Sequence, residues 1–282
     1  MEESFGAGLS DLQLGGFVAH FSDFRDQFVV IGGCACHELF ADEELPFRTT
    51  RDIDLVLTVL SLTDGFYRAF WDYVVAGGYE IYMTKPDDPA HPGRQCLYRF
   101  MNPESPAYPE QLEILTGTRE LPHPEGRTIY RLDPKDDASG LSAIVMDADY
   151  YDLVQSRRTT SGKGLPTVTA DVLLLLKMKA YLNLVKERQS GRIVRTKNLL
   201  KHRNDVYHLA TVLDGKFPGS LPEAVTGDLA RFLSLFARGE MKSEWEGILA
   251  HLAAYDVPMD VVGQASLTSR IVSYFNLASE VG

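Results

Sequence analysis

The chain has 282 residues, of which 45% are hydrophobic and 24% charged, an ordinary globular composition with room for one large domain or two unequal ones. It has no apolar run of the roughly 20 residues that a membrane-spanning helix requires. The N-terminal segment lacks the basic start and apolar stretch of a secretory signal, and three cysteines are too few for a disulfide framework. These features predict a cytoplasmic protein without a transmembrane helix.

The formal net charge of −11 argues against a general nucleic-acid binder. Residues 186–203 depart from that balance, because Glu187 is the one acidic residue among seven basic ones: Lys186, Arg188, Arg192, Arg195, Lys197, Lys201 and Arg203. Such a segment suits a phosphate-rich ligand, although a solvated helix face is the competing interpretation.

The first half of the chain is expected to alternate strands and helices. The hydrophobic pattern predicts helices over residues 9–25, 35–40 and 65–76, the last of them stopped by Gly77-Gly78. It predicts strands over residues 28–31, 53–60, 79–83, 95–101, 111–115 and 141–146. We therefore expect a mixed sheet with two or three helices.

The pattern changes after Pro166 to helices alone. They are predicted to begin with a capped helix at residues 169–184, followed by helices over residues 199–213, 221–239, 243–255 and 267–279. The Ser-, Thr- and Gly-rich residues 156–166 are the expected boundary. The sequence thus predicts an α+β fold, with a domain over residues 1–160 and a helical bundle over residues 161–282.

Two aspartates in the predicted strand 53–60 indicate a metal site. Residues two apart on a strand project to the same face, so Asp52 and Asp54 would present neighbouring carboxylates while Ile53 faces the core. Two carboxylates this close repel each other unless a cation lies between them. Such oxygen ligands suit Mg²⁺, and two ions about 3.5–4 Å apart would serve an in-line phosphoryl displacement.

The glycine pair at the end of strand 28–31 suggests where phosphates would lie. A strand that breaks at Gly32-Gly33 and enters a helix leaves backbone N–H groups open to a triphosphate at an electropositive helix end. Arg48 is positioned in the sequence to add charge-assisted contacts. Either motif is weak alone, and their order along the chain makes the pair more specific.

The pattern resembles the AbiEii-type nucleotidyltransferases of the DNA polymerase β-like superfamily. Ile31-Gly32-Gly33-Cys34-Ala35 and Arg48-Thr49-Thr50-Arg51-Asp52-Ile53-Asp54-Leu55 match the family's two N-terminal motifs. Residues 173–180 resemble its helical motif with Lys177, and residues 201–209 resemble its last motif with Asp205. Asn204 and His208 depart from that last motif, at positions that bear on substrate choice.

The resemblance implies a nucleotidyltransferase fold followed by a helical domain that closes a cleft, with Gly32, Gly33, Arg48, Thr50 and Lys177 on the nucleotide. It also implies that Lys177 and Asp205 take part in catalysis. Many members of the family are toxins of toxin–antitoxin or phage-defence systems, and some act on tRNA. From the sequence alone, pairing of Lys177 with Asp171, or of Asp205 with Lys201, is an equally simple reading.

The superfamily also implies a third carboxylate on a neighbouring strand. Glu113, an acid inside the apolar strand 111–115, is the first candidate for this metal ligand, and Asp147 is the second. Each is also explained as an ordinary strand-end residue.

The expected function is Mg²⁺-dependent transfer of a nucleoside monophosphate from an NTP to an acceptor hydroxyl, by a toxin acting on tRNA. Residues 186–203 would receive the tRNA, and an antitoxin protein is a further expected partner. The alternatives are transfer to a small-molecule or protein hydroxyl, and a degenerate descendant that binds a nucleotide without catalysis.

Overall fold

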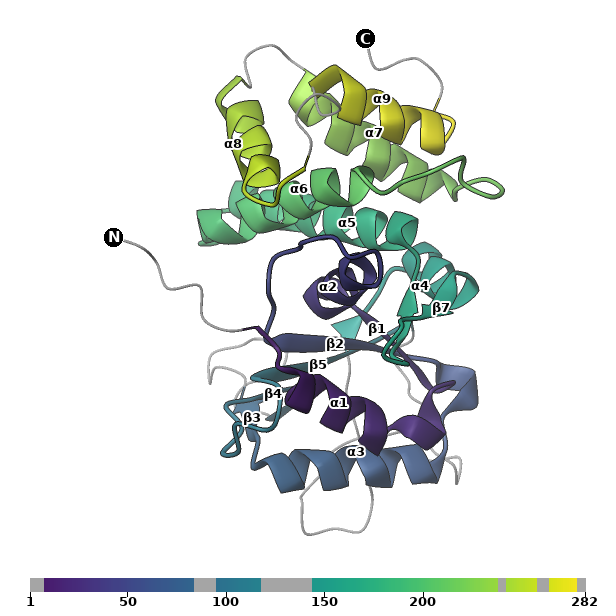
Figure 1. Cartoon of the computed structure of the whole chain (residues 1–282), viewed down its shortest axis with the longest axis vertical. Coiled ribbons are helices and arrows are strands. Elements are labelled where there is room, and N and C mark those ends of the chain that lie inside the picture. Colours follow the sequence, from purple (N-terminus) through teal and green to yellow (C-terminus); the bar gives the residue numbers. More distant parts are fainter. Residues whose placement is uncertain (1–7, 84–94, 118–143, 238–241, 258–263, 278–282) are drawn as a thin grey trace. The chain divides into compact units, whose positions relative to one another are not determined.

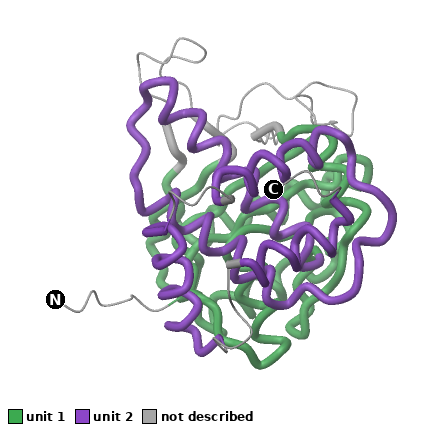
Figure 2. Tube along the Cα trace, turned by 90° about the horizontal axis from the view of Figure 1, so that it is seen from above, with its two compact units in different colours: residues 1–168 green, residues 169–282 purple. Residues whose placement is uncertain are grey.

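A computed structural model describes residues 8–83, 95–117, 144–237, 242–257 and 264–277. The chain divides into two compact units, Met1–Val168 and Thr169–Gly282, coloured separately in Figure 2. The boundary expected from the sequence, after residue 160, falls between the two strands of a hairpin that belongs to the first unit. Each unit is described by itself.

The first unit is built on a mixed sheet, so the expected α+β class is confirmed at that level. The strand order is β1-β2-β5-β4-β3, and β6 pairs with the C-terminal end of β5. Strands β2 and β5 are parallel, as are β5 and β6, and the other neighbours are antiparallel. The strands are β1 (Phe28–Ile31), β2 (Asp52–Leu57), β3 (Glu80–Met83), β4 (Gln95–Met101), β5 (Gln111–Thr116) and β6 (Ile144–Val145).

One face of the sheet packs on α1 (Asp11–His20) and α3 (Asp64–Gly77), which lie together on that side in Figure 1. Helix α1 begins at a capping box on Ser10, and α3 ends where Gly78 adopts a left-handed conformation. Aromatic rings form this core, among them the buried Phe17, Phe21, Phe28, Phe66, Phe70 and Phe100. The helix expected over residues 9–25 ends at His20, and a 3₁₀ turn, η1 (Ser22–Phe24), follows it.

The opposite face carries α2 (Gly32–Asp42), which starts at the glycine pair directly after β1. Between β2 and α3 lies a second 3₁₀ turn, η2 (Val59–Ser61). Residues 156–166, the expected boundary segment, contain most of a hairpin of β7 (Arg158–Thr160) and β8 (Pro166–Val168), preceded by a helix that the sequence did not predict, α4 (Ala148–Ser156).

This hairpin is held to the first unit by the guanidinium of Arg158. Its Nη2 donates to the carbonyl oxygens of Arg25 at 2.8 Å and Phe28 at 3.1 Å, and its Nη1 donates to that of Asp26 at 3.0 Å. The same guanidinium donates to Thr58 Oγ1 at 2.6 Å. The segment is therefore part of the first unit's folded structure.

In the described part of the second unit every regular element is a helix, as the sequence predicted. The helices are α5 (Ala170–Gln189), α6 (Thr196–Ala210), α7 (Glu223–Ala237), α8 (Lys242–Ala253) and α9 (Gln264–Tyr274). Buried rings of Tyr207, Phe232, Phe236 and Trp245 pack at its centre. Over the described ranges, no helix combines the length and apolar character needed to cross a membrane.

Candidate functional site

Asp54 lies directly against the first glycine of α2. In the β1–β2 register Ile31 is opposite Asp54, so the chain turns into α2 beside that carboxylate. Gly32 has a φ of +74°, and a Cβ atom there would lie 2.0 Å from Asp54 Oδ2. A residue with a side chain would be strained by the backbone conformation and would also displace Asp54.

Gly33 lies against the loop that leads into β2. A Cβ atom on Gly33 would be 2.8 Å from Thr50 Oγ1 and 3.4 Å from Arg48 Nη2. Thr50 is buried, and its Oγ1 accepts a hydrogen bond from the Asp52 amide at 3.5 Å. Arg48 also lies over the ring of Phe47, with its Cζ atom 5.6 Å from the ring centroid. The predicted residues Gly32, Gly33, Arg48 and Thr50 are therefore brought together.

The strand registers place the acidic residues and one arginine on the same sheet face. Asp54 on β2 is opposite Glu113 on β5, and Glu113 is in turn opposite Arg99 on β4. Asp52 is two residues from Asp54 on the same strand and therefore projects to the same face. Asp54, Glu113 and Arg99 thus form one row across three strands, and the sequence did not predict the place of Arg99 in it.

Glu113 has its own cation in this row. Arg99 Nη2 donates to Glu113 Oε1 at 2.6 Å, and the two side chains are 31% and 15% exposed. Asp147, the other candidate third carboxylate, is exposed and precedes α4, beyond the end of β6. The structure therefore puts Glu113, and not Asp147, beside Asp54.

Within the described ranges, no three or more His, Cys, Asp or Glu side chains are grouped as a metal site. Asp52 and Asp54 nevertheless offer carboxylates from one sheet face, both only partly exposed. Two carboxylates suit a Mg²⁺ ion that completes its octahedral shell with waters and substrate oxygens. The residues present therefore fit a divalent cation held by this pair.

In the second unit, Lys177 and Asp205 form a buried ion pair. Lys177 Nζ on α5 lies 3.0 Å from Asp205 Oδ2 on α6, and the side chains are 6% and 0% exposed. Asp171, the alternative partner considered for Lys177, instead accepts a hydrogen bond from Tyr274 Oη at 3.1 Å. The two predicted residues thus meet each other inside the helical unit.

The basic segment 186–203 is mostly exposed and is ordered at its turn. Arg188 Nη2 donates to the Val194 carbonyl oxygen at 3.2 Å and to Thr196 Oγ1 at 2.9 Å. Arg203 differs from the others, since it is 3% exposed and pairs with Glu244 on α8. Lys201 is partly buried, so five basic residues of the segment are exposed: Lys186, Arg188, Arg192, Arg195 and Lys197.

The two departures from the family's last motif have structural roles on α6. Asn204 Oδ1 accepts hydrogen bonds from Arg203 Nε at 3.0 Å and Nη2 at 2.8 Å. His208 is 1% exposed, and its ring lies 5.7 Å from that of His251 and 5.3 Å from that of Tyr255, between centroids.

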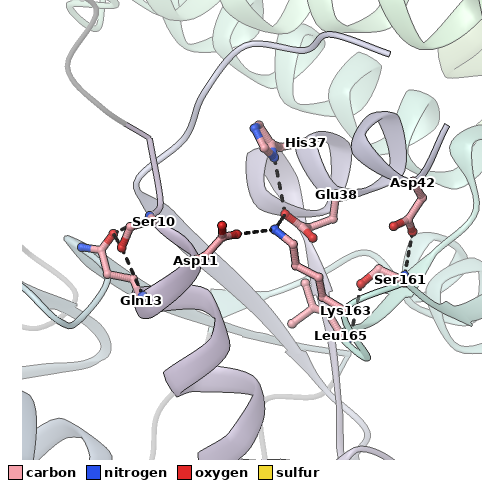
Figure 3. Close-up of polar contacts among 10 residues, drawn as sticks. Ser10, Asp11, Gln13, His37, Glu38, Asp42, Ser161, Lys163 and Leu165 are labelled. Carbon is pink, nitrogen blue, oxygen red and sulfur yellow. Dashed lines mark hydrogen bonds and ion pairs between the residues drawn. The ribbon is translucent and has the colours of Figure 1, made fainter. Parts of the chain in front are cut away.

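A buried acid on α2 escaped the sequence interpretation. Glu38 is 2% exposed and lies 3.4 Å from His37 Nδ1 and 3.3 Å from Lys163 Nζ, as Figure 3 shows. Lys163, on the turn between β7 and β8, also reaches Asp11 Oδ1 on α1 at 2.9 Å. The signal in the sequence was an acid one turn after Cys34, between the apolar residues Ala35 and Phe40 of the same helix.

Cys34, on the same helix as Glu38, is a buried thiol close to the carboxylates of Glu38 and Asp54. Burial raises its pKa, and the negative charges of Glu38 and Asp54 raise it further. Its start-of-helix position therefore does not make it acidic, and it serves as a small packed residue beside the glycines.

A scan against family models, a search of curated proteins and a search of solved structures each returned no match to this chain.

Proposed function

We propose that this chain is a metal-dependent nucleotidyltransferase that moves a nucleoside monophosphate from an NTP to an acceptor hydroxyl. The supporting observation is the contact between two separate motifs, in which Asp54 lies against Gly32 at the start of α2. A bare helix N-terminus beside a carboxylate pair suits a triphosphate that arrives with a divalent cation. The nucleotidyltransferase fold of the first unit is part of this proposal.

The site residues divide the work of binding the metal and the nucleotide. Asp52 and Asp54 hold Mg²⁺, which when bound supplies charge neutralisation and orients the substrate's oxygens. Backbone N–H groups at Gly32-Gly33 donate to the phosphates, and the Arg48 guanidinium adds a charge-assisted contact. Thr50, against Gly33, fixes the loop that carries Arg48.

In the reaction, the acceptor oxygen bonds to the α-phosphorus while the bond from that phosphorus to the bridging oxygen breaks. Pyrophosphate leaves, and the acceptor's proton passes to a site carboxylate. Positioning and charge neutralisation provide most of the rate enhancement. The family resemblance also assigns Lys177 and Asp205 to catalysis, and in the helical unit these two residues form an ion pair with each other.

For the acceptor we propose tRNA, bound through the exposed cations of residues 186–203. Arg192 and Arg195 flank Ile193, which is fully exposed, on the turn that Arg188 orders. Exposed cations on one segment suit the phosphate backbone of a nucleic acid. A toxin role opposed by an antitoxin protein belongs to this proposal through the resemblance alone.

The test is incubation of the purified chain with Mg²⁺, each α-labelled NTP in turn, and total tRNA, resolved on a denaturing gel. We expect label in the tRNA band, lost in Asp52→Ala and Asp54→Ala. Asp72→Asn is the matched control, because this aspartate is exposed on α3, on the other side of the sheet. Full transfer by the Asp54→Ala variant would refute the assignment.

Other outcomes of this experiment would support a different acceptor or a protein that binds nucleotide without catalysis. Label on protein indicates a protein hydroxyl as the acceptor, and label on a small molecule in an extract indicates a metabolite. Unchanged tRNA labelling by Arg192→Glu/Arg195→Glu removes residues 186–203 from the acceptor site. Nucleotide binding without pyrophosphate release indicates a binding-only descendant.

A further inference from the structure

Arg99 occupies a particular place beside the carboxylates of the proposed site. Neighbouring strands of a sheet lie about 4.7–4.9 Å apart, and like charges on paired residues of one face repel. Asp54 and Glu113 are such a pair, and Arg99 is opposite Glu113 on the next strand. A positive side chain therefore stands next to the second carboxylate of an acidic pair.

The Arg99–Glu113 contact is partly withdrawn from water. With Glu113 15% exposed and the two charged atoms 2.6 Å apart, the pair is a strong charge-assisted hydrogen bond. Glu113 Oε1 is directed to Arg99, and so this carboxylate is neutralised from within the sheet. Among Asp52, Asp54, Glu113 and Arg99 the net charge is then −2, which one divalent cation balances.

We propose that Arg99 is a positioning residue that takes the place of a cation on Glu113 and so keeps this carboxylate out of the metal-binding set. The chain then holds one divalent cation, on Asp52 and Asp54, and any second ion must arrive with the nucleotide. This inference rests on the metal site of the proposed function. It explains why a third acid lies beside Asp54 although no three-residue metal cluster is present in the described ranges.

The experiment is titration of the full chain with Mn²⁺ without nucleotide, with free Mn²⁺ measured by electron paramagnetic resonance. We expect the wild type to bind one ion. Arg99→Met should tighten Mn²⁺ binding by about tenfold or more, because a carboxylate charge beside Asp54 is no longer neutralised. Arg99→Met/Glu113→Gln should return the affinity to that of the wild type, and Arg99→Lys should keep it there.

Two controls separate this effect from general changes in charge or folding. Lys179→Met removes a cation from a comparable pair, in which Lys179 Nζ lies 2.8 Å from Asp228 Oδ2, with side chains 25% and 22% exposed. It should leave Mn²⁺ binding unchanged. Fluorescence in a Trp245→Phe background, which reports Trp71 alone, checks the fold of each variant, because Trp71 packs on Phe100, the neighbour of Arg99.

The outcomes distinguish this inference from the proposed function. Equal Mn²⁺ affinity in the wild type and in Arg99→Met overturns the inference, as does binding of two ions by the wild type. Loss of Mn²⁺ binding in Asp54→Asn supports the proposed metal site independently. If Arg99→Met binds Mn²⁺ but the wild type and Arg99→Met/Glu113→Gln do not, the role of Arg99 on Glu113 is supported. The metal site proposed for the wild-type chain is then refuted.

Discussion

Lys163 places its Nζ atom 3.3 Å from Oε1 of Glu38, a carboxylate whose side chain is 3% exposed. Lys163 belongs to the turn of the β7–β8 hairpin, Glu38 to α2, and Asp11, the other partner of Lys163, to α1 (Figure 3). The same turn makes a second contact with α2, because the Gly162 amide donates to Asp42 Oδ2 at 2.8 Å. The hairpin turn thus connects α1 to the helix that starts at Gly32.

The first prediction concerns Lys163→Met, which leaves the buried Glu38 without its lysine. We expect the free energy of unfolding of the first unit to fall by about 1–2 kcal/mol, moderated because Lys163 is half-exposed. The chain has two tryptophans, one in each unit, so urea unfolding in a Trp245→Phe background is read from Trp71 alone. Asp11→Asn is the control and should change little, because Asp11 is 91% exposed.

We expect the loss of stability in Lys163→Met to depend on pH. Burial acts to raise the pKa of Glu38, but the hydrogen bond from His37 and the charge of Lys163 outweigh it and hold this pKa below its ordinary 4.5. The hydrogen bond to Asp11 raises the pKa of Lys163 above 10.5, against the opposing effect of burial. An acid whose pKa is lowered on folding stabilises the folded state at pH values above its unfolded pKa. A lysine whose pKa is raised on folding stabilises the folded state at pH values below its unfolded pKa.

The stability difference between wild type and Lys163→Met should therefore be largest between pH 4.5 and 10.5. It should shrink as the pH falls through the folded pKa of Glu38, and again as the pH rises through that of Lys163. A difference that stays constant down to about pH 2 would show that the ion pair is not its source.

The second prediction concerns Gly32→Ala. The left-handed backbone costs alanine about 1–2 kcal/mol, and its Cβ atom would displace the Asp54 carboxylate. Mn²⁺ binding and nucleotidyl transfer should both be lost. Gly215→Ala is matched for backbone strain, with a φ of +76° and no neighbour within 4 Å of the added Cβ, and should keep both activities. Wild-type Mn²⁺ affinity in Gly32→Ala would contradict the proposed site.

The third prediction concerns the buried pair in the helical unit. Lys177→Met removes the ammonium group that lies 3.0 Å from the buried carboxylate of Asp205, which should lower the free energy of unfolding by about 3–5 kcal/mol. Lys177→Met/Asp205→Leu should recover a large part of this loss, because an apolar pair replaces the ionic one. Urea unfolding read from Trp245 in a Trp71→Phe background measures both. Asp205→Leu alone completes the cycle, and additive effects of the two substitutions would show that the residues do not interact.

Local patterns in the sequence were enough for many elements. Strand β1, its break at Gly32-Gly33 and the turn into α2 follow from an apolar run that ends in residues permissive of a left-handed backbone. The projection of Asp52 and Asp54 to one face follows from the two-residue period of a strand. The helices after Pro166 were predicted because their periodicity and capping residues are local as well.

Contacts between distant segments depended on the tertiary structure. Strand order and register alone put Glu113 opposite Asp54 and Arg99 opposite Glu113, and neither is encoded by spacing along the chain. Helix packing likewise decided that Lys177 meets Asp205 and that Arg203 turns inward to Glu244.

The β7–β8 hairpin could not be predicted from the sequence either, because its Ser-, Thr- and Gly-rich composition is shared by linkers and turns. What makes it part of the first unit is the set of hydrogen bonds from Arg158 to Arg25, Asp26 and Phe28, carbonyl groups at the other end of that unit's sequence. A short-range pattern specifies an element, whereas its partners depend on which surfaces the whole chain buries together.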